Sequence, residues 1–421
     1  MRSLIAFTGK FWEWRKQYKL LFALCLMFFF WTLFDGTVSY ITPLAIKQAG
    51  FSDTLIGFII GSSSIFGALF DMFLSKFLKS THFRRIYLLM FILCFAFPVV
   101  LLIGRTLFMF VLAMAIWGLY FDLMNFGTLD FVGRKADESE RADHFGRLSI
   151  FKELGYMLAP LVVGLVIGES DIIGAPPLIL MCIFLGISVL FFVVVTSISK
   201  KEKQEYIEDE KLRIRNVFVE IYLWRTFGRA LFPALVLFTL LNIFDSFFWT
   251  LGPLLAESYT NLHPFNGILL TVYTLPSLLV GWFVGNVTSK FGKRRTAYGA
   301  FFLSSVAIAF FSSMHNPYLI LLDVFVASSF LGFSFPALNG AFSDYLVESA
   351  NREREIEALG DFYTNIGYVV GPMVAGLLAD KVGIAGSFSY LGIFCAVCGA
   401  LLLVMAPRKI HPQIVVPRSI S

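Results

Sequence analysis

Charged residues are scarce in this sequence. They make up 15% of the 421 residues, whereas 57% are hydrophobic and the mean hydropathy is +0.77. A soluble protein of this length needs far more polar surface to cover its core, so the composition excludes a soluble fold. It indicates an all-α polytopic membrane protein. The start of the chain lacks a short apolar run with a small-residue cleavage site, so we expect the first apolar segment to remain as an anchor.

Motifs that would indicate an enzyme or a metal site are also missing. The sequence contains no phosphate loop, nucleophile elbow or zinc motif, and its five histidines lie in loops or near the ends of apolar segments. Its five cysteines lie inside apolar segments, where packing is the simplest interpretation. Cys395 and Cys398 form a CxxC pair without the partner pair of a metal site. We therefore expect no enzyme activity, metal or cofactor.

Apolar segments long enough to span a membrane, about 20 residues each, recur along the whole chain. A charged linker at 199–230 divides them six and six. This pattern predicts two six-helix bundles, 20–198 and 231–406, preceded by an amphipathic segment at 1–19 and followed by a tail at 407–421. The twelve predicted spans are 20–46, 52–76, 85–104, 107–131, 147–168, 175–198, 231–256, 264–289, 295–314, 318–346, 359–380 and 385–406.

The basic residues favour one orientation. If the N-terminus lies inside, most of the 34 Lys and Arg residues fall in loops on the inner side or in the two termini, so we expect both termini to be cytoplasmic. We expect the protein to lie in a bacterial-type plasma membrane. In the linker, NVFVEIYLWRTFGR carries apolar residues at helical spacing with Arg flanks. It predicts a helix lying along the inner membrane surface, and FWEWRKQYK near the N-terminus could do the same.

Two aspartates lie in the middle of very apolar segments, Asp35 in FFFWTLFDGTVSYITPLAI and Asp245 in LFTLLNIFDSFFWTLGPLL. Each follows a Phe and precedes a proline by eight residues, Pro43 or Pro253. A carboxylate at membrane depth is costly and therefore marks a functional site by default. Two that are related by an internal repeat indicate transport, because transporters bind substrate between repeated halves near the midplane.

The repeat continues along both halves at an offset of about 210 to 214 residues. GYMLAP at 155–160 matches GYVVGP at 367–372. The other matched pairs are Gly57 with Gly267, Arg84 with Arg294, Arg85 with Arg295, Gly118 with Gly332, Phe121 with Phe335, Asn125 with Asn339, and Asp130 with Asp344.

With these features the chain resembles the major facilitator superfamily over nearly its full length. GWFVGNVTSKFGKRR at 281–295 is similar to the family's loop motif, with Ser289 in place of its usual aspartate. In the fifth span, Gly146, Gly155, Ala159-Pro160 and Val163-Gly164 fit the spacing of the family's drug/proton antiporters, although Ala159 and Val163 replace two glycines. The eleventh span keeps Gly367, Gly371-Pro372 and Gly376. This resemblance implies export, but Met114 stands where proton-coupled exporters usually carry an Arg.

The resemblance also implies a gating role for acids that pair with a basic loop cluster. Asp130 is the candidate partner of Arg84 or Arg85, and Asp344 that of Arg294 or Arg295. By depth along their helices, Lys152 could pair with Asp122 or with Glu153. The expected gating residues are Asp130, Arg84, Arg85, Asp344, Arg294, Arg295, Lys152, Glu153, Pro160 and Pro372.

Polar stripes at helical spacing predict the central site. Desolvation disfavours a charged carboxylate, so Asp35, Asp122 and Asp245 are the expected proton or cation-coupling groups. The alternative is that one or two of them only hold helices together. Side chains expected to line the substrate cavity are Thr32, Ser39, Tyr40, Asn125, Asn242, Trp249, Tyr273, Asn339 and Tyr368.

These observations predict a monomeric secondary transporter that moves a small organic molecule by alternating access. We favour proton-coupled export of amphipathic or cationic compounds, because an acidic, aromatic cavity attracts cations. One alternative is proton-coupled symport of a nutrient such as a sugar. Another is a non-transporting receptor, scaffold or lipid-handling protein. The expected partners are the substrate, protons and the bilayer, and nucleic acid is not among them.

Overall fold

The computed structural model describes residues 2–78, 82–135, 141–167, 174–199, 217–259, 262, 265–348 and 353–405. Twelve helices in these ranges are long and apolar enough to cross a membrane, and each coincides with one predicted span. The helices are α1 (Arg2–Gln48), α2 (Asp53–Leu78), α3 (Phe83–Ile103), α4 (Leu107–Lys135), α5 (Arg141–Ile167), α6 (Ala175–Ile198), α7 (Val217–Ser258), α8 (Ile268–Phe291), α9 (Lys293–Ala309), α10 (Pro317–Glu348), α11 (Glu353–Val382) and α12 (Ile384–Met405).

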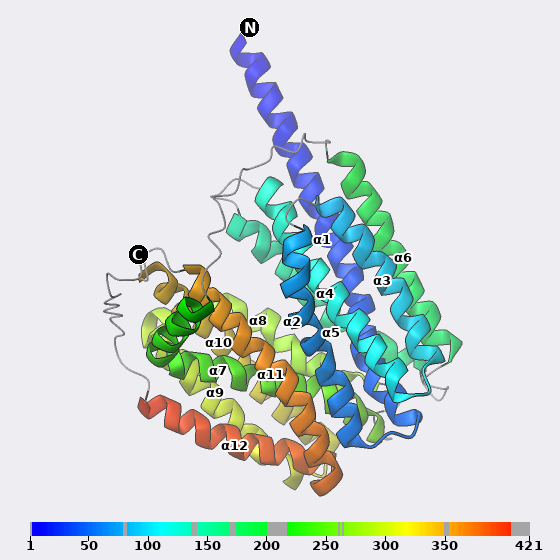
Figure 1. The fold of residues 1–421 in the computed structure, drawn as a ribbon, viewed down its shortest axis with the longest axis vertical. Helices are drawn as coiled ribbons and strands as arrows, with labels where there is room; N and C mark the ends of the chain where they lie inside the picture. The colour runs from blue at the N-terminus through cyan, green and yellow to red at the C-terminus, as the bar shows by residue number, and fades with distance from the viewer. Residues whose placement is uncertain are drawn as a thin grey trace.

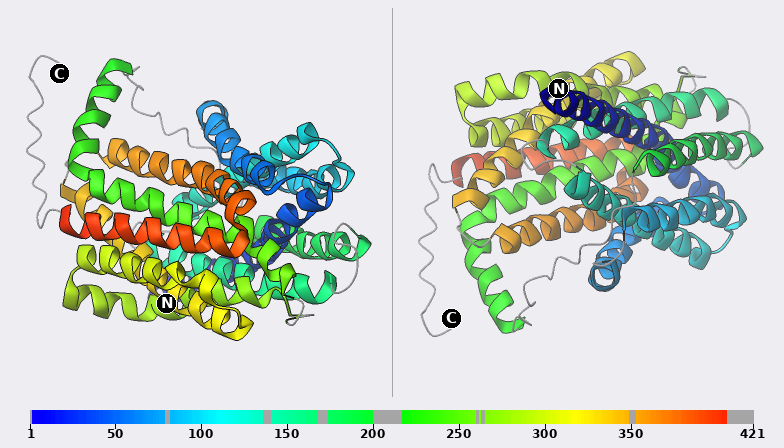
Figure 2. Two further views of the ribbon diagram at one scale, coloured as in Figure 1. Left: turned by 90° about the horizontal axis from the view of Figure 1, so that it is seen from below. Right: turned by 90° about the horizontal axis from the view of Figure 1, so that it is seen from above.

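The helices form two bundles that lie side by side, α1–α6 and α7–α12 (Figures 1 and 2). In the first half α1 packs against α5 and α6, and in the second half α7 packs against α11 and α12. Contacts between the halves are made mainly by α2 with α11 and by α5 with α8. Glycines with positive φ follow three helices, at Gly50 after α1, Gly292 after α8 and Gly383 after α11. This left-handed conformation carries no steric penalty in glycine, so these residues end the helices.

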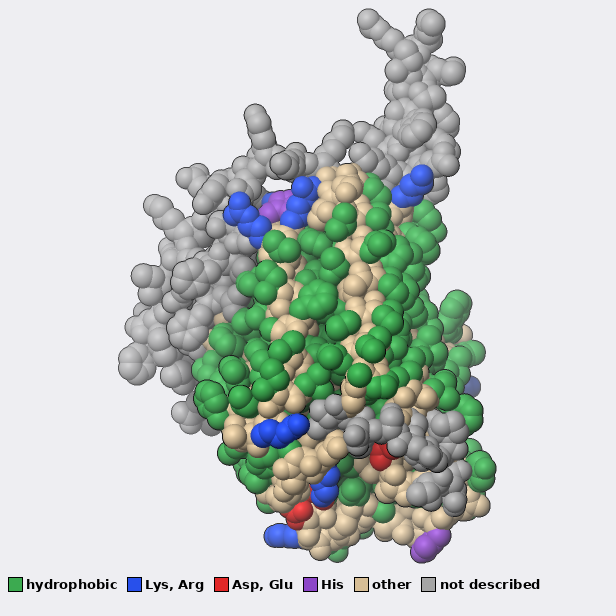
Figure 3. All heavy atoms as spheres, turned by 90° about the vertical axis from the view of Figure 1, so that its right-hand side faces the viewer, with side chains coloured by type: hydrophobic (Ala, Val, Ile, Leu, Met, Phe, Trp, Pro, Cys, Tyr) green, Lys and Arg blue, Asp and Glu red, His purple; other side chains and the backbone are tan. Residues whose placement is uncertain are grey.

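The helices that carry the paired aspartates lie at the centre. For α1 and α7, 78% of the apolar span is buried, whereas the other spans are 50% buried or less. Elsewhere large apolar side chains face outward, including Phe108 (75% exposed) and Trp282 (83% exposed). Figure 3 shows one such face, with an apolar middle and charged side chains toward its two ends. An apolar surface of this kind is what a lipid-facing belt requires.

The two sides of the bundle differ. We call the side on which α1 begins the proximal side, and the side of the α1–α2 connection the distal side. On the proximal side α1 extends beyond the bundle (Figure 1). Residues 2–19, predicted as a separate segment, are continuous with α1, and the predicted linker helix is the beginning of α7, which starts at Val217. Residues 200–216 and the predicted tail lie outside the described residues.

Candidate functional site

Asp35 lies inside the N-terminal half, 2% exposed, and its carboxylate accepts three hydrogen bonds. Trp117 Nε1 (3.1 Å) and Tyr120 Oη (2.6 Å), both on α4, donate to Oδ1. Tyr156 Oη of α5 donates to Oδ2 at 2.8 Å. Hydrogen bonds to a charged acceptor are strong, and these replace the water that the buried carboxylate has lost.

Asp245 has a matching environment inside the C-terminal half. Tyr273 Oη of α8 donates to its Oδ1 at 2.7 Å, and Tyr368 Oη of α11 donates to its Oδ2 at 2.9 Å. These donors belong to the same half as Asp245, just as the donors to Asp35 belong to the other half. Each half therefore completes its own carboxylate cluster.

Tyr156 and Tyr368 are equivalent positions of the repeat. Each follows a glycine and precedes a proline by four residues, in GYMLAP and GYVVGP. Sequence reasoning placed Tyr368 in the site but missed Tyr156, although the match between the two hexapeptides was a signal for it. The remaining donors differ, because Trp117 and Tyr120 come from α4 whereas Tyr273 comes from α8.

The two clusters approach each other across the interface between the halves. The ring of Tyr156 lies edge-on to that of Trp249, with 6.0 Å between centroids. Ser277 Oγ of α8 donates to Glu153 Oε2 of α5 at 3.2 Å. Glu153, predicted only as a gating residue, thus lies between the two carboxylate clusters. We call this region, which contains Tyr156, Trp249, Glu153 and Ser277, the central layer.

The contacts of Lys152 differ from the ion pair that was predicted for it. Its Nζ lies 3.5 Å from the Met124 sulfur and 5.8 Å from the centroid of the Phe28 ring. Among the described side chains, no carboxylate lies within ion-pair distance of Lys152. The predicted partner Asp122 instead faces Gly67 of α2, on a different side of α4 from Trp117 and Tyr120. Depth along a helix does not fix direction, and these two side chains leave their helices in different directions.

Several predicted cavity residues form helix contacts instead. The hydroxyl of Thr32 donates to Phe28 O, and the side-chain nitrogen of Asn242 donates to Phe238 O. Thr32 is buried where α1 packs against Gly155 of α5, and Asn242 is buried where α7 packs against Gly367 of α11. Ser39 donates to Asp35 O of its own helix. The repeat-related Asn125 and Asn339 are both exposed.

The predicted pairs at the proximal side are not formed. Asp130 accepts from the backbone nitrogen of Phe83 at 2.8 Å and pairs with Arg134 at 2.6 Å, so it caps α3. Asp344 pairs with Lys293 at 2.7 Å, while Arg294 lies over the ring of Tyr345. Arg84 donates to the carbonyl of Ser199, and Arg85 and Arg295 are exposed. In each half, the acid at the end of span 4 or 10 thus contacts the start of the preceding span, 3 or 9.

The distal side is closed by backbone contacts between the halves. A Cβ at Gly57 of α2 would collide with the carbonyl oxygen of Pro372 in α11, and a Cβ at Gly267 would collide with that of Pro160 in α5. Gly57 and Gly267 are repeat equivalents, as are the two prolines. The two crossings, α2 on α11 and α8 on α5, are therefore related by the same repeat as the carboxylate clusters.

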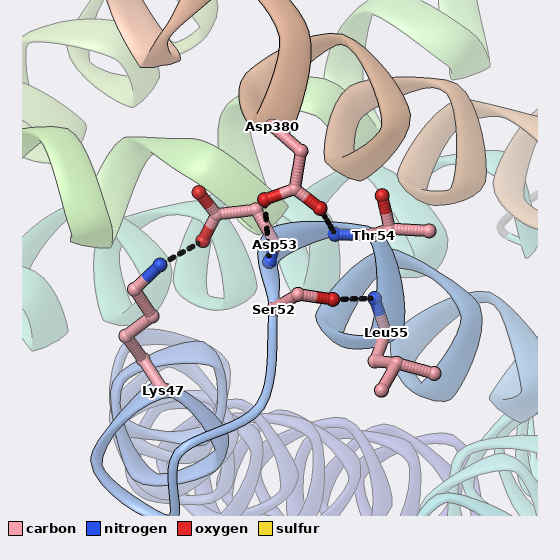
Figure 4. Close-up of polar contacts among 6 residues, drawn as sticks. All are labelled: Lys47, Ser52, Asp53, Thr54, Leu55 and Asp380. Carbon is pink, nitrogen blue, oxygen red and sulfur yellow. Dashed lines mark hydrogen bonds and ion pairs between the residues drawn. The ribbon is translucent and has the colours of Figure 1, made fainter.

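Side chains strengthen this closure. Asp380 of α11 accepts from the backbone nitrogens of Asp53 (3.2 Å) and Thr54 (2.9 Å), the first residues of α2 (Figure 4). Asp53 in turn pairs with Lys47 at 2.7 Å. Deeper in the interface, Tyr40 Oη of α1 donates to Glu257 Oε1 of α7 at 2.7 Å. Tyr40, predicted to line the cavity, is fully buried in this seal.

Removing the Asp380 side chain should loosen the distal closure. An Asp380→Ala variant leaves two amides of α2 without their acceptor, and loss of a helix cap costs about 0.5–2 kcal/mol. Because Asp380 is exposed, we expect the low end, a few-fold faster amide hydrogen exchange at residues 53–56. The neighbouring Lys381→Ala variant is the control, and equal exchange in the two variants would show that Asp380 does not hold α2.

The sequence matches the family model described as Major Facilitator Superfamily over residues 20–262 and 235–418. The chain belongs to this superfamily. Membership and the twelve-helix fold identify it as a membrane transporter rather than an enzyme, and confirm both predictions.

Solved transporters share this fold at low sequence identity. A structure titled nucleoside transporter NupG is 14% identical, with a TM-score of 0.71 over 94% of this chain and 100% of that one. A bacterial homologue of the human lysosomal transporter Spinster, inward-facing and unoccupied, is 13% identical, with a TM-score of 0.70 over 92% and 96%. The peptide transporter POT in complex with sulfate is 15% identical, with a TM-score of 0.68 over 93% and 94%. A search of curated proteins found no match.

Proposed function

We propose that this superfamily member is a proton-coupled exporter of amphipathic or cationic organic compounds. The observation that supports it is the pair of repeat-related carboxylates, Asp35 and Asp245, each held by tyrosine hydroxyls beside the interface between the halves. Carboxylates surrounded by aromatic rings attract cations through charge and cation–π contacts. The same carboxylates are groups that a proton can neutralise.

Alternating access gives the two carboxylates their roles. The closed distal side and the prediction of cytoplasmic termini together correspond to a state closed toward the outside. In this proposal the protein works as a monomer in a bacterial-type plasma membrane. A proton and the substrate occupy the central layer in turn, and Asp35 carries the proton while Asp245 meets the substrate.

Flux measurements in liposomes test this function. The purified chain is reconstituted, a pH gradient is imposed, and cationic dyes, sugars and amino acids are compared. Movement of a dye against the proton gradient supports export, and accumulation of a sugar together with protons supports symport. Protein-free liposomes set the background, and the absence of gradient-dependent flux for every compound would contradict proton coupling.

Lys152 favours a second candidate, proton-coupled symport of a polar nutrient. Its ammonium group lies among Met124 and Phe28 beside the central layer, without a carboxylate at ion-pair distance among the described residues. A half-buried cation in this position suits a substrate that carries a negative or strongly polar group.

A Lys152→Met variant separates the two candidates. Methionine keeps an unbranched side chain but removes the charge. For a cationic substrate we expect flux to be kept or to rise a few-fold, since a repulsion of about 1 kcal/mol is relieved in a partly hydrated site. For a nutrient that binds Lys152, uptake should fall at least about tenfold, as expected when a charged hydrogen bond is lost. The exposed Lys381→Met variant is the control.

A further inference from the structure

Three contacts within about one turn of α5, at residues 156–160, connect the Asp35 cluster with the distal closure. Tyr156 donates to Asp35 of its own half at 2.8 Å. The next residue, Met157, accepts at its carbonyl from Thr271 Oγ1 of the other half at 2.9 Å. Four residues after Tyr156, the carbonyl oxygen of Pro160 touches Gly267, also of the other half.

The same arrangement recurs on α11. Tyr368 donates to Asp245 at 2.9 Å. The carbonyl of the next residue, Val369, lies against Gly61 of α2, and the carbonyl of Pro372 lies against Gly57. Gly61 is the repeat equivalent of Thr271 at the offset of 210. Two short segments, 156–160 and 368–372, thus contact a buried carboxylate on one side. On the other side they contact a helix of the opposite half, α8 or α2, and we call these two the gate helices.

A proline, Pro160 or Pro372, makes each segment a hinge, which we call the joint. Proline has no backbone N–H, so Pro160 leaves the carbonyl of Tyr156 without its helical donor, and Pro372 does the same to Tyr368. A helix is most easily bent at such a position. The angle between the two parts of α5 then depends on what holds each part, which includes the bond from Tyr156 to Asp35 and the contact of Pro160 with Gly267.

We propose that Tyr156 and Tyr368 are positioning residues that couple the occupancy of Asp35 and Asp245 to closure of the distal side. This inference rests on the proposed function in one respect, because it takes these carboxylates as the groups whose occupant changes during transport. A proton or substrate on the carboxylate competes with the tyrosine hydroxyl for the same oxygen. Release of the tyrosine frees the joint, and the gate helix of the opposite half loses its support.

Amide hydrogen exchange of the full-length protein, without substrate and at one fixed pH, tests the coupling. The variants are Tyr156→Phe and Tyr368→Phe, which remove only the hydroxyl. Loss of a hydrogen bond to a charged group should speed exchange at the distal contacts about tenfold. We expect Tyr156→Phe to act most on 267–274 at the start of α8, and Tyr368→Phe most on 53–61 at the start of α2.

Tyr87→Phe is the matched control, since Tyr87 is a fully buried tyrosine whose hydroxyl donates to Thr128 within the N-terminal half. Faster exchange at both distal segments, with the start of α9 unchanged, also supports coupling, through a gate that opens as one unit. Exchange equal to that of Tyr87→Phe, or acceleration that includes the start of α9, would overturn it.

The exchange result does not depend on the proposed transport activity. If liposomes show no proton-driven flux but the distal segments respond as expected, the coupling stands and the proposed function fails. If proton-driven flux is present but exchange does not respond, the function stands and the coupling fails.

Discussion

An Asp35→Asn variant is expected to lose proton-driven flux by about a hundredfold or more, the effect of removing a positioned proton-transfer group. Asparagine has the shape of aspartate and still accepts hydrogen bonds, so Trp117 and Tyr120 keep a partner and the chain should fold. What it lacks is a site for a proton. The measurement is gradient-driven flux in liposomes, compared with exchange of labelled substrate across the membrane without a gradient.

The two flux modes make this result specific. Exchange of substrate needs no net proton movement, so it should persist in Asp35→Asn while accumulation disappears. Asp323→Asn is the matched control, because Asp323 is another buried aspartate, 8% exposed in α10, with no contact to either carboxylate cluster among those described above. Coupled transport at the normal rate in Asp35→Asn would remove Asp35 from the mechanism.

The second large effect is expected from Gly57→Leu. The backbone of α2 touches the carbonyl of Pro372 at this glycine, so any side chain forces α2 and α11 apart. Overpacking of this kind typically costs about 1–3 kcal/mol, which lowers the population of the distally closed state roughly ten- to a hundredfold. Because transport requires both states, flux should fall by a similar factor, and residues 53–61 should exchange their amide hydrogens faster.

Gly186→Leu provides the control for this substitution. Gly186 lies on the exposed face of α6 with nothing within 4 Å of a Cβ, so leucine there extends into open space. Its flux should match that of the unaltered protein. Normal flux in Gly57→Leu would mean that the close approach of α2 and α11 is not needed for transport.

The twelve helices and their division into halves were predictable because apolar length alone decides them. The location of Asp35 and Asp245 inside apolar spans was predictable for a related reason. A carboxylate is easily recognised in a sequence where almost every neighbour is apolar. Tyr156 was not, because aromatic residues make up 17% of the chain and a single tyrosine carries little information. Only its place in the repeat distinguishes it from the others.

Direction around a helix was harder to predict than depth. The predicted pairing of Asp122 with Lys152 used only their depths, but Asp122 faces α2 and Lys152 faces Met124. The acids Asp130 and Asp344 show a different difficulty. A carboxylate near a helix start can pair with arginine or cap free amides, and Asp130 does both here, with Arg134 of its own helix and with the first amide of α3. The choice depends on the angle between neighbouring helices, which spacing in the sequence does not contain.

The location of each carboxylate's donors within its own half has a consequence for turnover. When the distal side opens, the bonds from Trp117, Tyr120 and Tyr273 to the carboxylates stay within their halves, whereas the bonds between the halves must break. These include Tyr40 with Glu257, Thr271 with Met157, and Asp380 with α2. Each contributes about 0.5–1.5 kcal/mol net, so the set amounts to a few kcal/mol. A barrier of this origin permits opening on the microsecond-to-millisecond timescale of domain motions, fast enough that the reorientation of the loaded protein need not limit the rate.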